Sequence, residues 1–236
     1  SKKVSTYKRI VKENEKLKET LHHSLKPYHH TFQRYEALPS SGLSQTAILA
    51  DIEKMNALES PRWQDGYVSG GIYHGDKEHI NFLNKVYGLH SQSNPLHSDL
   101  FPSATKFEAE VISMVATLHG QGKTLDNSEL CGTVTSGGSE SIMLAMKTYR
   151  DKALQERGIT KPEMITPASA HVAFDKAAQY FNIKQIKIPL NANFTVNPAD
   201  VENAITKNTV AIVGSAPCFP HGIIDPIPEL SAIALK

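Results

Sequence analysis

The residues best suited to carry chemistry form a glycine-rich run directly before a long helical pattern. In this run Gly137 and Gly138 follow a serine, and Ser139 stands where the helix would begin. Glycines let the backbone approach a ligand closely, and the first amides of a helix, at the positive end of its dipole, favour a phosphate group. Ser139 can also cap the helix with its hydroxyl group. We therefore expect a phosphate cradle at Gly137, Gly138 and Ser139, with a plain turn and helix cap as the alternative.

Two further polar segments follow predicted strands. His171 comes shortly after the strand expected over residues 164–166, and Ser215 comes at the end of the strand expected over residues 209–214. The flat ring of His171 is suited to stacking on a planar cofactor, while a capping or hydrogen-bonded role is the alternative. Because parallel sheets bind ligands at the carboxyl ends of their strands, we expect these segments and the glycine-rich run to converge as three successive strand ends.

The elements that must position these residues alternate between helices and strands from residue 132 onward. Gly158 and Asn182 are typical of residues just past a helix end, and Asn197-Pro198 is typical of a helix start. The expected order is a helix over 139–157, a strand over 164–166, a helix over 173–181, a strand over 185–188, a helix over 197–205 and a strand over 209–214. This alternation predicts an α/β fold with a mainly parallel sheet and helices on both faces.

The chain in front of this region is predicted to be mainly helical. The expected helices cover residues 1–26, 46–58, 79–87 and 104–119. The first is basic and amphipathic, and the second should end before Pro61. We expect an N-terminal helical arm of residues 1–60 and a domain of residues 61–236. The apolar stripe of the arm would pack on the body or on a partner subunit, with contact to a membrane surface as the alternative.

Composition narrows the possible functions. The 236 residues include 25 Lys and Arg and 24 Asp and Glu, a net charge of +1, so no global charge would recruit nucleic acid. Cys131 and Cys218 are the only cysteines, which argues against a disulfide framework and a zinc site, and we expect no metal. No apolar run reaches the ~18 residues of a transmembrane segment, and no signal peptide opens the chain. We expect a cytoplasmic protein.

Together these motifs resemble the pyridoxal-phosphate enzymes of the aspartate aminotransferase fold type, and in particular the sphingosine-1-phosphate lyase family. The resemblance runs from about Gly70 to the end of the chain. It rests on the segments Ser-Gly-Gly-Ile-Tyr-His-Gly-Asp, Gln-Ser-Asn-Pro-Leu-His-Ser-Asp-Leu-Phe-Pro-Ser, Thr-Ser-Gly-Gly-Ser-Glu-Ser, Ala-His-Val-Ala-Phe-Asp-Lys-Ala-Ala and Gly-Ser-Ala-Pro-Cys-Phe-Pro-His-Gly. It implies the large domain of fold type I, with pyridoxal 5'-phosphate as the cofactor. In this resemblance, Gly137, Gly138 and Ser139 hold the cofactor phosphate, His171 stacks on the pyridine ring, and Ser215 lines the edge of the ring.

The resemblance also implies a substrate and a reaction. Tyr73 and His97 match family positions near the substrate phosphate and the bond that breaks, across the interface of a homodimer. Asn94 and Asp99 lie in the same motif as His97, and Asn94 is a candidate for substrate binding. The family cleaves a phosphorylated sphingoid base by retro-aldol chemistry to a fatty aldehyde and phosphoethanolamine, after a base takes the proton of the β-hydroxyl group. Tyr73 is the first candidate for this proton transfer and His97 is the second.

Part of the family pattern is not found before Lys236. The family keeps its Schiff-base lysine in a Thr-x-x-His-Lys context and the acidic partner of the pyridine nitrogen in a His-Val-Asp segment, and neither occurs here. We therefore expect the native protein to be longer, with the C-terminal part of the domain missing. An amino-acid decarboxylase of the same fold is the alternative enzyme, because Ser-Gly-Gly, a stacking histidine and Gly-x-Ile-Asp-Pro recur there. A cofactor-less assembly module is another alternative, as is a membrane-associated location if a native N-terminal anchor was removed.

Overall fold

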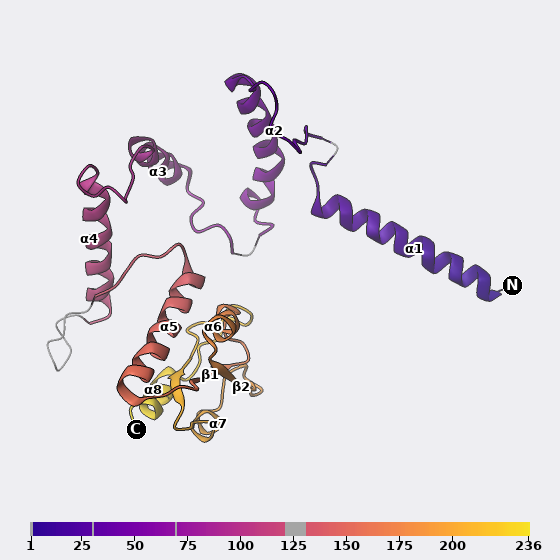
Figure 1. Cartoon of the computed structure of the whole chain (residues 1–236). Helices are drawn as coiled ribbons and strands as arrows, with labels where there is room; N and C mark the ends of the chain where they lie inside the picture. The colour runs from indigo at the N-terminus through magenta and orange to yellow at the C-terminus, as the bar shows by residue number, and fades with distance from the viewer. Residues whose placement is uncertain (1, 30, 69, 121–130) are drawn as a thin grey trace. The chain divides into compact units, whose positions relative to one another are not determined.

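The computed structural model describes residues 2–29, 31–68, 70–120 and 131–236. Contacts between residues divide the chain into two units, Ser1–Ser93 and Asn94–Lys236. The described part of the first unit is helical, and the second unit combines helices with a sheet (Figure 1). The boundary expected between an arm and a domain at residue 60 falls inside the first unit and stays a prediction.

The helices of the first unit confirm the helical segments expected there. They are α1 (Lys2–Leu25), α2 (Gln45–Gln64) and α3 (Lys77–His90). Ser44 and Asp76 cap α2 and α3, each by accepting a hydrogen bond from the amide three residues further on. The Tyr28 hydroxyl donates a 2.6 Å hydrogen bond to Glu59, which ties the turn after α1 to α2. Within the described residues, no helix combines the length and the apolar character needed to cross a membrane.

The expected end of α2 before Pro61 is wrong, because the helix continues through this proline to Gln64. A proline inside a helix leaves one carbonyl without its amide partner, here that of Ala57. Ala57 is exposed, so water can take the missing place. The Asp65 amide then donates to the Pro61 carbonyl at 3.0 Å and closes the last turn. One lost bond near the end of an exposed helix is therefore tolerated.

The second unit is built around a parallel sheet. Its described elements are α4 (Pro102–Leu118), α5 (Gly138–Arg157), β1 (Glu163–Pro167), α6 (Ala173–Phe181), β2 (Lys184–Ile188), α7 (Pro198–Asn203), β3 (Thr209–Ile212) and α8 (Ile227–Ala234). The strand order is β2-β1-β3 and both pairs are parallel, with Ile165 opposite Ile186 on one side and Ile212 on the other. These elements confirm the expected α/β alternation and the parallel sheet.

Local sequence signals end α5 and α6 where they were expected to end and start α7 as expected, but α7 ends at Asn203 and not at residue 205. Gly158 follows α5 with a φ of 64°, and Asn182 follows α6 with a φ of 54°. Glycine has no Cβ to clash in this left-handed conformation, and asparagine visits it more readily than most residues. Asn197 caps α7 by accepting the amide hydrogen of Ala199, and Pro198 is the first helical residue. The ends of α5 and α6 let the chain turn back and enter the next strand.

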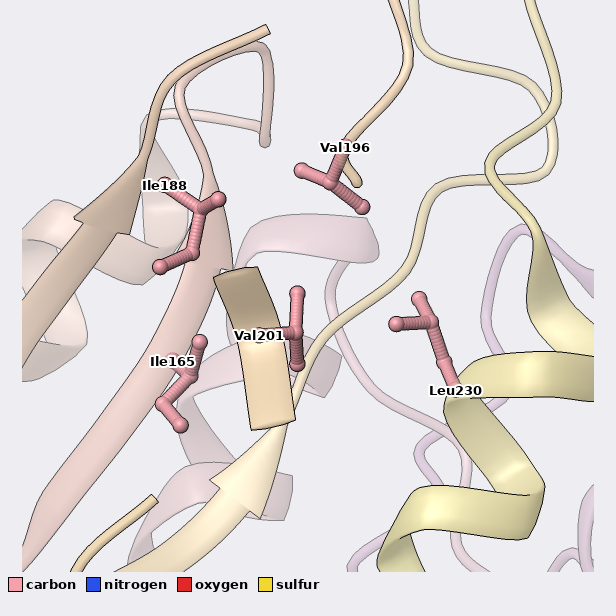
Figure 2. Packing of buried hydrophobic residues seen from close by; sticks show 5 residues of the cluster. All are labelled: Ile165, Ile188, Val196, Val201 and Leu230. Carbon is pink, nitrogen blue, oxygen red and sulfur yellow. The ribbon is translucent and has the colours of Figure 1, made fainter. Parts of the chain in front are cut away.

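Helices cover both faces of the sheet, as expected. The side chains packed between the sheet, α7 and α8 form one cluster (Figure 2): Ile165, Ile188, Val196, Val201 and Leu230. The side chains packed between the sheet, α5 and α6 form the other: Met146, Met164, Ala177 and Ile183. Met164 and Ile165 are neighbours in β1 and serve opposite faces, because successive side chains of a strand alternate. Full burial of such a side chain contributes about 1.5–3 kcal/mol.

A buried acid joins the amino ends of the strands. Glu163, at the start of β1, accepts hydrogen bonds from Lys184 Nζ at 2.8 Å and from Thr206 Oγ1 at 2.6 Å. The Lys184 bond first, and then the Thr206 bond, lower the pKa of Glu163, while desolvation opposes the shift. Arg157, the last residue of α5, donates to the Thr209 carbonyl at the start of β3 at 3.3 Å. The end of α5 therefore lies at the amino ends of the strands, so the helix begins toward their carboxyl ends.

Candidate cofactor site

The first turn of α5 presents backbone amides without an acceptor. The N-cap is Gly137, which has no side chain that could accept a hydrogen bond. The Ser141 amide donates to the Gly137 carbonyl at 3.1 Å, but the amides of Gly138, Ser139 and Glu140 have no acceptor among the described residues. The expected capping role of Ser139 is wrong, because this residue already lies inside the first turn and a cap must precede it.

Side chains brace the loop before α5 instead of capping the helix. Glu140 accepts the amide hydrogen of Ser136 at 2.6 Å and its hydroxyl hydrogen at 2.5 Å. The hydroxyl bond first, and then the amide bond, lower the pKa of Glu140. Thr135 donates its hydroxyl to the Gly137 carbonyl at 3.0 Å. The loop is thus held by its own side chains, while the first amides point out of the end of the helix.

Helices α5 and α6 pack side by side and begin at the same end. Near their starts, Ile142 of α5 and Phe174 of α6 pack against the same buried cluster. Further along, Arg150 of α5, seven residues before the end of that helix, donates to the carbonyl of Phe181, the last residue of α6, at 3.4 Å. Because both helices rise by the same amount per residue, the first turn of α5 lies level with the residues just before α6. These residues include His171.

The glycine-rich run does not follow a strand, so the expected convergence of three strand ends is wrong on this point. Residues 131–135 have no regular secondary structure and pair with no strand in the described part of the chain. A strand forms only where a neighbour completes its ladder of hydrogen bonds. The carboxyl ends of β1 and β3 do lie together, because the Val213 amide donates to the Ile165 carbonyl at 2.9 Å.

His171 stands between β1 and α6 with an exposed side chain. Its Nδ1 lies 3.0 Å from the Ala173 amide nitrogen. A backbone amide can only donate, so Nδ1 is the acceptor and the ring proton of the neutral imidazole sits on Nε2. His171 precedes the N-cap Val172, so the expected hydrogen-bonded role is present and fixes the orientation of the ring, while stacking on a cofactor stays a prediction.

Ser215 follows β3, is half-buried and is held by a buried acid. Its amide donates to Asp225 Oδ2 at 2.8 Å, and its carbonyl accepts the Asp225 amide at 2.9 Å. Beside it, Gly214 allows α8 to approach closely, because a Cβ there would lie 2.6 Å from Ile227 Cδ1. Ser215 is thus fixed at the carboxyl end of β3, and its contact with a cofactor ring stays a prediction.

The residues expected to act on the substrate lie on exposed loops. Tyr73 belongs to the first unit, where it precedes α3 and is fully exposed. In the second unit, Asn94 Oδ1 accepts the Leu96 amide at 3.1 Å, and the Asn94 carbonyl accepts the His97 amide at 3.0 Å. The side chains of His97 and Asp99 are exposed. The roles of Tyr73 and His97 in catalysis, and of Asn94 in substrate binding, stay predictions.

Two residues that shape the site are not among those predicted from the sequence. Glu140 is the third residue of α5 and follows Ser136 by four positions. This spacing is similar to the serine–glutamate pattern of helix starts, from which the contact could have been predicted. Asp225 is the acid of the Gly-x-Ile-Asp-Pro motif, to which the sequence analysis gave no task. Its burial and its bond to Ser215 arise from the fold.

The donor set fits a flat cofactor that carries a phosphate. The free amides at the positive end of α5 can bind phosphate oxygens. A Cβ on Gly137 or Gly138 would meet no atom within 4 Å, so there is open space beside this turn. The exposed and oriented ring of His171 lies at the same end of the helix layer. No group of three His, Cys, Asp or Glu side chains suited to a metal ion occurs within the described ranges.

Similarity to known proteins points to the same cofactor. The chain is 47% identical over 202 residues to a protein of Oryza sativa subsp. japonica named sphingosine-1-phosphate lyase, and this match covers 84% of the chain and 37% of the relative. The structure of sphingosine-1-phosphate lyase from Burkholderia pseudomallei K96243 is similar with a TM-score of 0.84 and 42% identity, over 89% of this chain and 48% of that one. The chain thus spans little more than a third of the rice relative.

A more distant structure shares the fold. Glutamate decarboxylase of Lactobacillus brevis CGMCC 1306 is similar with a TM-score of 0.64 and 20% identity, over 88% of this chain and 47% of that one. Residues 27–219 match the conserved domain of the pyridoxal-dependent decarboxylases, whose cofactor is pyridoxal phosphate. Because this match covers most of the sequence, the chain belongs to the pyridoxal-dependent decarboxylase family.

Proposed function

We propose that this chain carries the cofactor-binding part of a pyridoxal-phosphate-dependent carbon–carbon lyase that cleaves phosphorylated sphingoid bases such as sphingosine 1-phosphate. The observation that carries the proposal is the first turn of α5, whose free amides lie level with His171 at the start of the neighbouring helix. The relatives named sphingosine-1-phosphate lyase, among them the rice protein at 47% identity and a yeast protein at 39%, support this substrate class.

Each cofactor residue would have a task that suits its position. The amides of Gly138 and Ser139 would donate to phosphate oxygens, and Gly137 leaves this turn uncapped. The ring of His171 would support the pyridine ring, with the Ala173 amide holding its orientation. Ser215 would lie at the edge of the ring. When bound, pyridoxal phosphate supplies a sink for the electron pair that is left when a Cα–Cβ bond breaks.

Tyr73 and His97 would supply the proton chemistry. When the Cα–Cβ bond of the substrate breaks, a base must take the proton of the β-hydroxyl group, whose oxygen becomes the aldehyde oxygen. The Cα atom must then receive a proton, which gives phosphoethanolamine. Tyr73 is the first candidate for the base and His97 is the second, and Asn94 would help to bind the substrate.

The proposal includes an assembly and a location. A homodimer with the active site at its interface follows from the family positions that Tyr73 and His97 match. A cytoplasmic location stays a prediction, and so does contact of the basic helix α1 with a membrane surface.

The choice of substrate separates the lyase from the alternatives. The full-length polypeptide that contains this chain is loaded with pyridoxal phosphate and incubated with sphingosine 1-phosphate, with glutamate or with an aromatic amino acid. We expect a long-chain aldehyde and phosphoethanolamine from the first and no carbon dioxide from the others. Carbon dioxide without aldehyde would replace the lyase by a decarboxylase. A protein that binds no pyridoxal phosphate would favour the cofactor-less assembly module.

A further inference from the structure

Asp225 is a buried acid to which the proposed chemistry gives no task. The residue is only 4% exposed. Its Oδ2 accepts the Ser215 amide at 2.8 Å, and its Oδ1 accepts the Val196 amide at 3.3 Å. A carboxylate accepts hydrogen bonds at both oxygens and so suits two amides that face it. Because a buried charge is costly unless its hydrogen bonds are made, these contacts hold the side chain in one position.

The contacts of Asp225 join segments that are distant in the sequence. Ser215 lies three residues after the end of β3, whereas Val196 belongs to the connection between β2 and α7. Asp225 itself leads into α8, where its carbonyl accepts the Ile227 amide at 2.7 Å. Val196 is 1% exposed and belongs to the same core cluster as Leu230 of α8 (Figure 2). The backbone at Ser215 is therefore tied to the core of the unit.

We propose that Asp225 is a positioning residue that holds Ser215 in place for the ring of the cofactor. The inference rests on the proposed function, because it places pyridoxal phosphate at the carboxyl ends of β1 and β3. Asp225 acts through Ser215, whose amide and carbonyl are both bonded to it, at 2.8 and 2.9 Å. Without the carboxylate, the Ser215 amide loses its acceptor and only the backbone bond from the residue 225 amide to the Ser215 carbonyl remains, so the hydroxyl group is held less firmly beside the ring.

Glu163 offers a matched control. It is a second buried acid of this unit, 7% exposed, and it accepts hydrogen bonds from Lys184 and Thr206. It lies at the amino end of β1, whereas Asp225 contacts the residue that follows the carboxyl end of β3. Removal of either carboxylate disrupts the bonds of a buried acid, but only the loss of Asp225 should disturb Ser215.

The test compares Asp225→Asn, Asp225→Ala and Glu163→Gln with the wild type, each in the full-length polypeptide. Hydrogen exchange at the Ser215 amide is measured in the apoprotein, and the Kd of pyridoxal phosphate is measured by absorbance titration. Urea unfolding reports the stability of each variant. Alanine removes both oxygen acceptors of Asp225. Asparagine keeps one oxygen but replaces the other by an NH₂ group, so one of the amides of Ser215 and Val196 would face a donor.

We expect both Asp225 variants to raise the Ser215 exchange rate and the Kd of pyridoxal phosphate by about tenfold or more, while Glu163→Gln changes both by less than about twofold. The absorption maximum of the bound cofactor should shift only in the Asp225 variants, because only there does the ring lose a fixed neighbour. If Asp225→Ala does not fold, the asparagine variant carries the comparison.

Three results would decide against the proposal. Wild-type affinity for pyridoxal phosphate in the Asp225 variants would overturn it, even if Ser215 exchanges faster. Equal weakening in Glu163→Gln would also overturn it, because the affinity would then follow stability alone. A wild-type protein that binds no pyridoxal phosphate would overturn the proposed function together with the cofactor role of Asp225, and the Ser215 exchange rates would still report whether Asp225 holds that residue.

Discussion

Glu140 accepts both the amide hydrogen and the hydroxyl hydrogen of Ser136, at 2.6 and 2.5 Å. The third residue of α5 thereby ties down the loop before the helix, while the N-cap Gly137 offers no side-chain acceptor. A serine or aspartate at this position normally accepts an amide of the second or third helical residue. In this protein those amides remain available to another acceptor, and a phosphate group suits them.

Gly137→Ser should raise stability and lower the affinity for the cofactor. A Cβ on Gly137 would meet no atom within 4 Å, so serine fits, and its hydroxyl can accept an amide of the first turn. Such a cap adds about 1 kcal/mol to the free energy of unfolding and competes with phosphate for the same amides. Urea unfolding measures the first effect, and titration of the full-length polypeptide with pyridoxal phosphate measures the second.

Gly137→Ala is the matched control, because it adds the Cβ without an acceptor. It should leave the affinity for pyridoxal phosphate much closer to that of the wild type than Gly137→Ser does. A serine variant that becomes more stable and still binds pyridoxal phosphate like the wild type would show that the phosphate does not use these amides.

Two substitutions of His171 should separate its hydrogen bond with the Ala173 amide from its ring. Asparagine keeps an acceptor for the Ala173 amide but has no ring, whereas alanine lacks both. We expect His171→Ala to lower the free energy of unfolding by about 1 kcal/mol and His171→Asn to lower it less. Both variants should retain less pyridoxal phosphate after dialysis. Normal retention by the asparagine variant would remove the imidazole from cofactor binding.

Tyr73→Phe should lower turnover without affecting the cofactor. The substitution removes only the phenolic hydroxyl, and Tyr73 is fully exposed, so no packing is lost. Loss of a group that transfers a proton lowers the rate by about 10²–10⁴-fold. Aldehyde release from sphingosine 1-phosphate measures turnover, and absorbance measures the bound cofactor. Unchanged turnover would leave His97 as the candidate base.

Glu163 should contribute to the loss of stability in acid. The Lys184 bond first, and then the Thr206 bond, hold its pKa below the ordinary value of 4.5. A carboxyl group whose pKa falls on folding stabilises the protein above its unfolded pKa, and this contribution disappears as the pH falls through the folded pKa. Glu163→Gln should therefore reduce the steepness of the stability loss below a pH of about 4.5. Urea unfolding at a series of pH values checks this, and an equally steep loss in the variant would contradict it.

Much of the second unit could be predicted from the sequence because local signals decide it. Gly158 and Asn182 are typical of residues that follow a helix end, and the short apolar run at Met164 and Ile165 between two helical patterns favours a buried strand. The end of α2 was wrongly predicted at Pro61, because the sequence does not show what the missing backbone hydrogen bond costs. That cost depends on how close the proline lies to the helix end and on whether water reaches the unpaired carbonyl.

The candidate site could be predicted only in part. The glycine-rich run was readable, but whether Gly137 or Ser139 becomes the N-cap depends on where the helix begins, to within two residues. The bond between Ser215 and Asp225 joins residues ten positions apart and exists only once α8 packs on the sheet. Such contacts follow from tertiary packing and leave little trace in the local sequence.

The phosphate cradle is tested most directly by hydrogen exchange at the amides of Gly138, Ser139 and Glu140 in the full-length polypeptide. Exchange is measured without ligand, with pyridoxal phosphate and with pyridoxal, which lacks the phosphate group. We predict that pyridoxal phosphate slows exchange at these amides and that pyridoxal does not. Unchanged exchange in a protein that has bound pyridoxal phosphate would mean that the phosphate is held elsewhere.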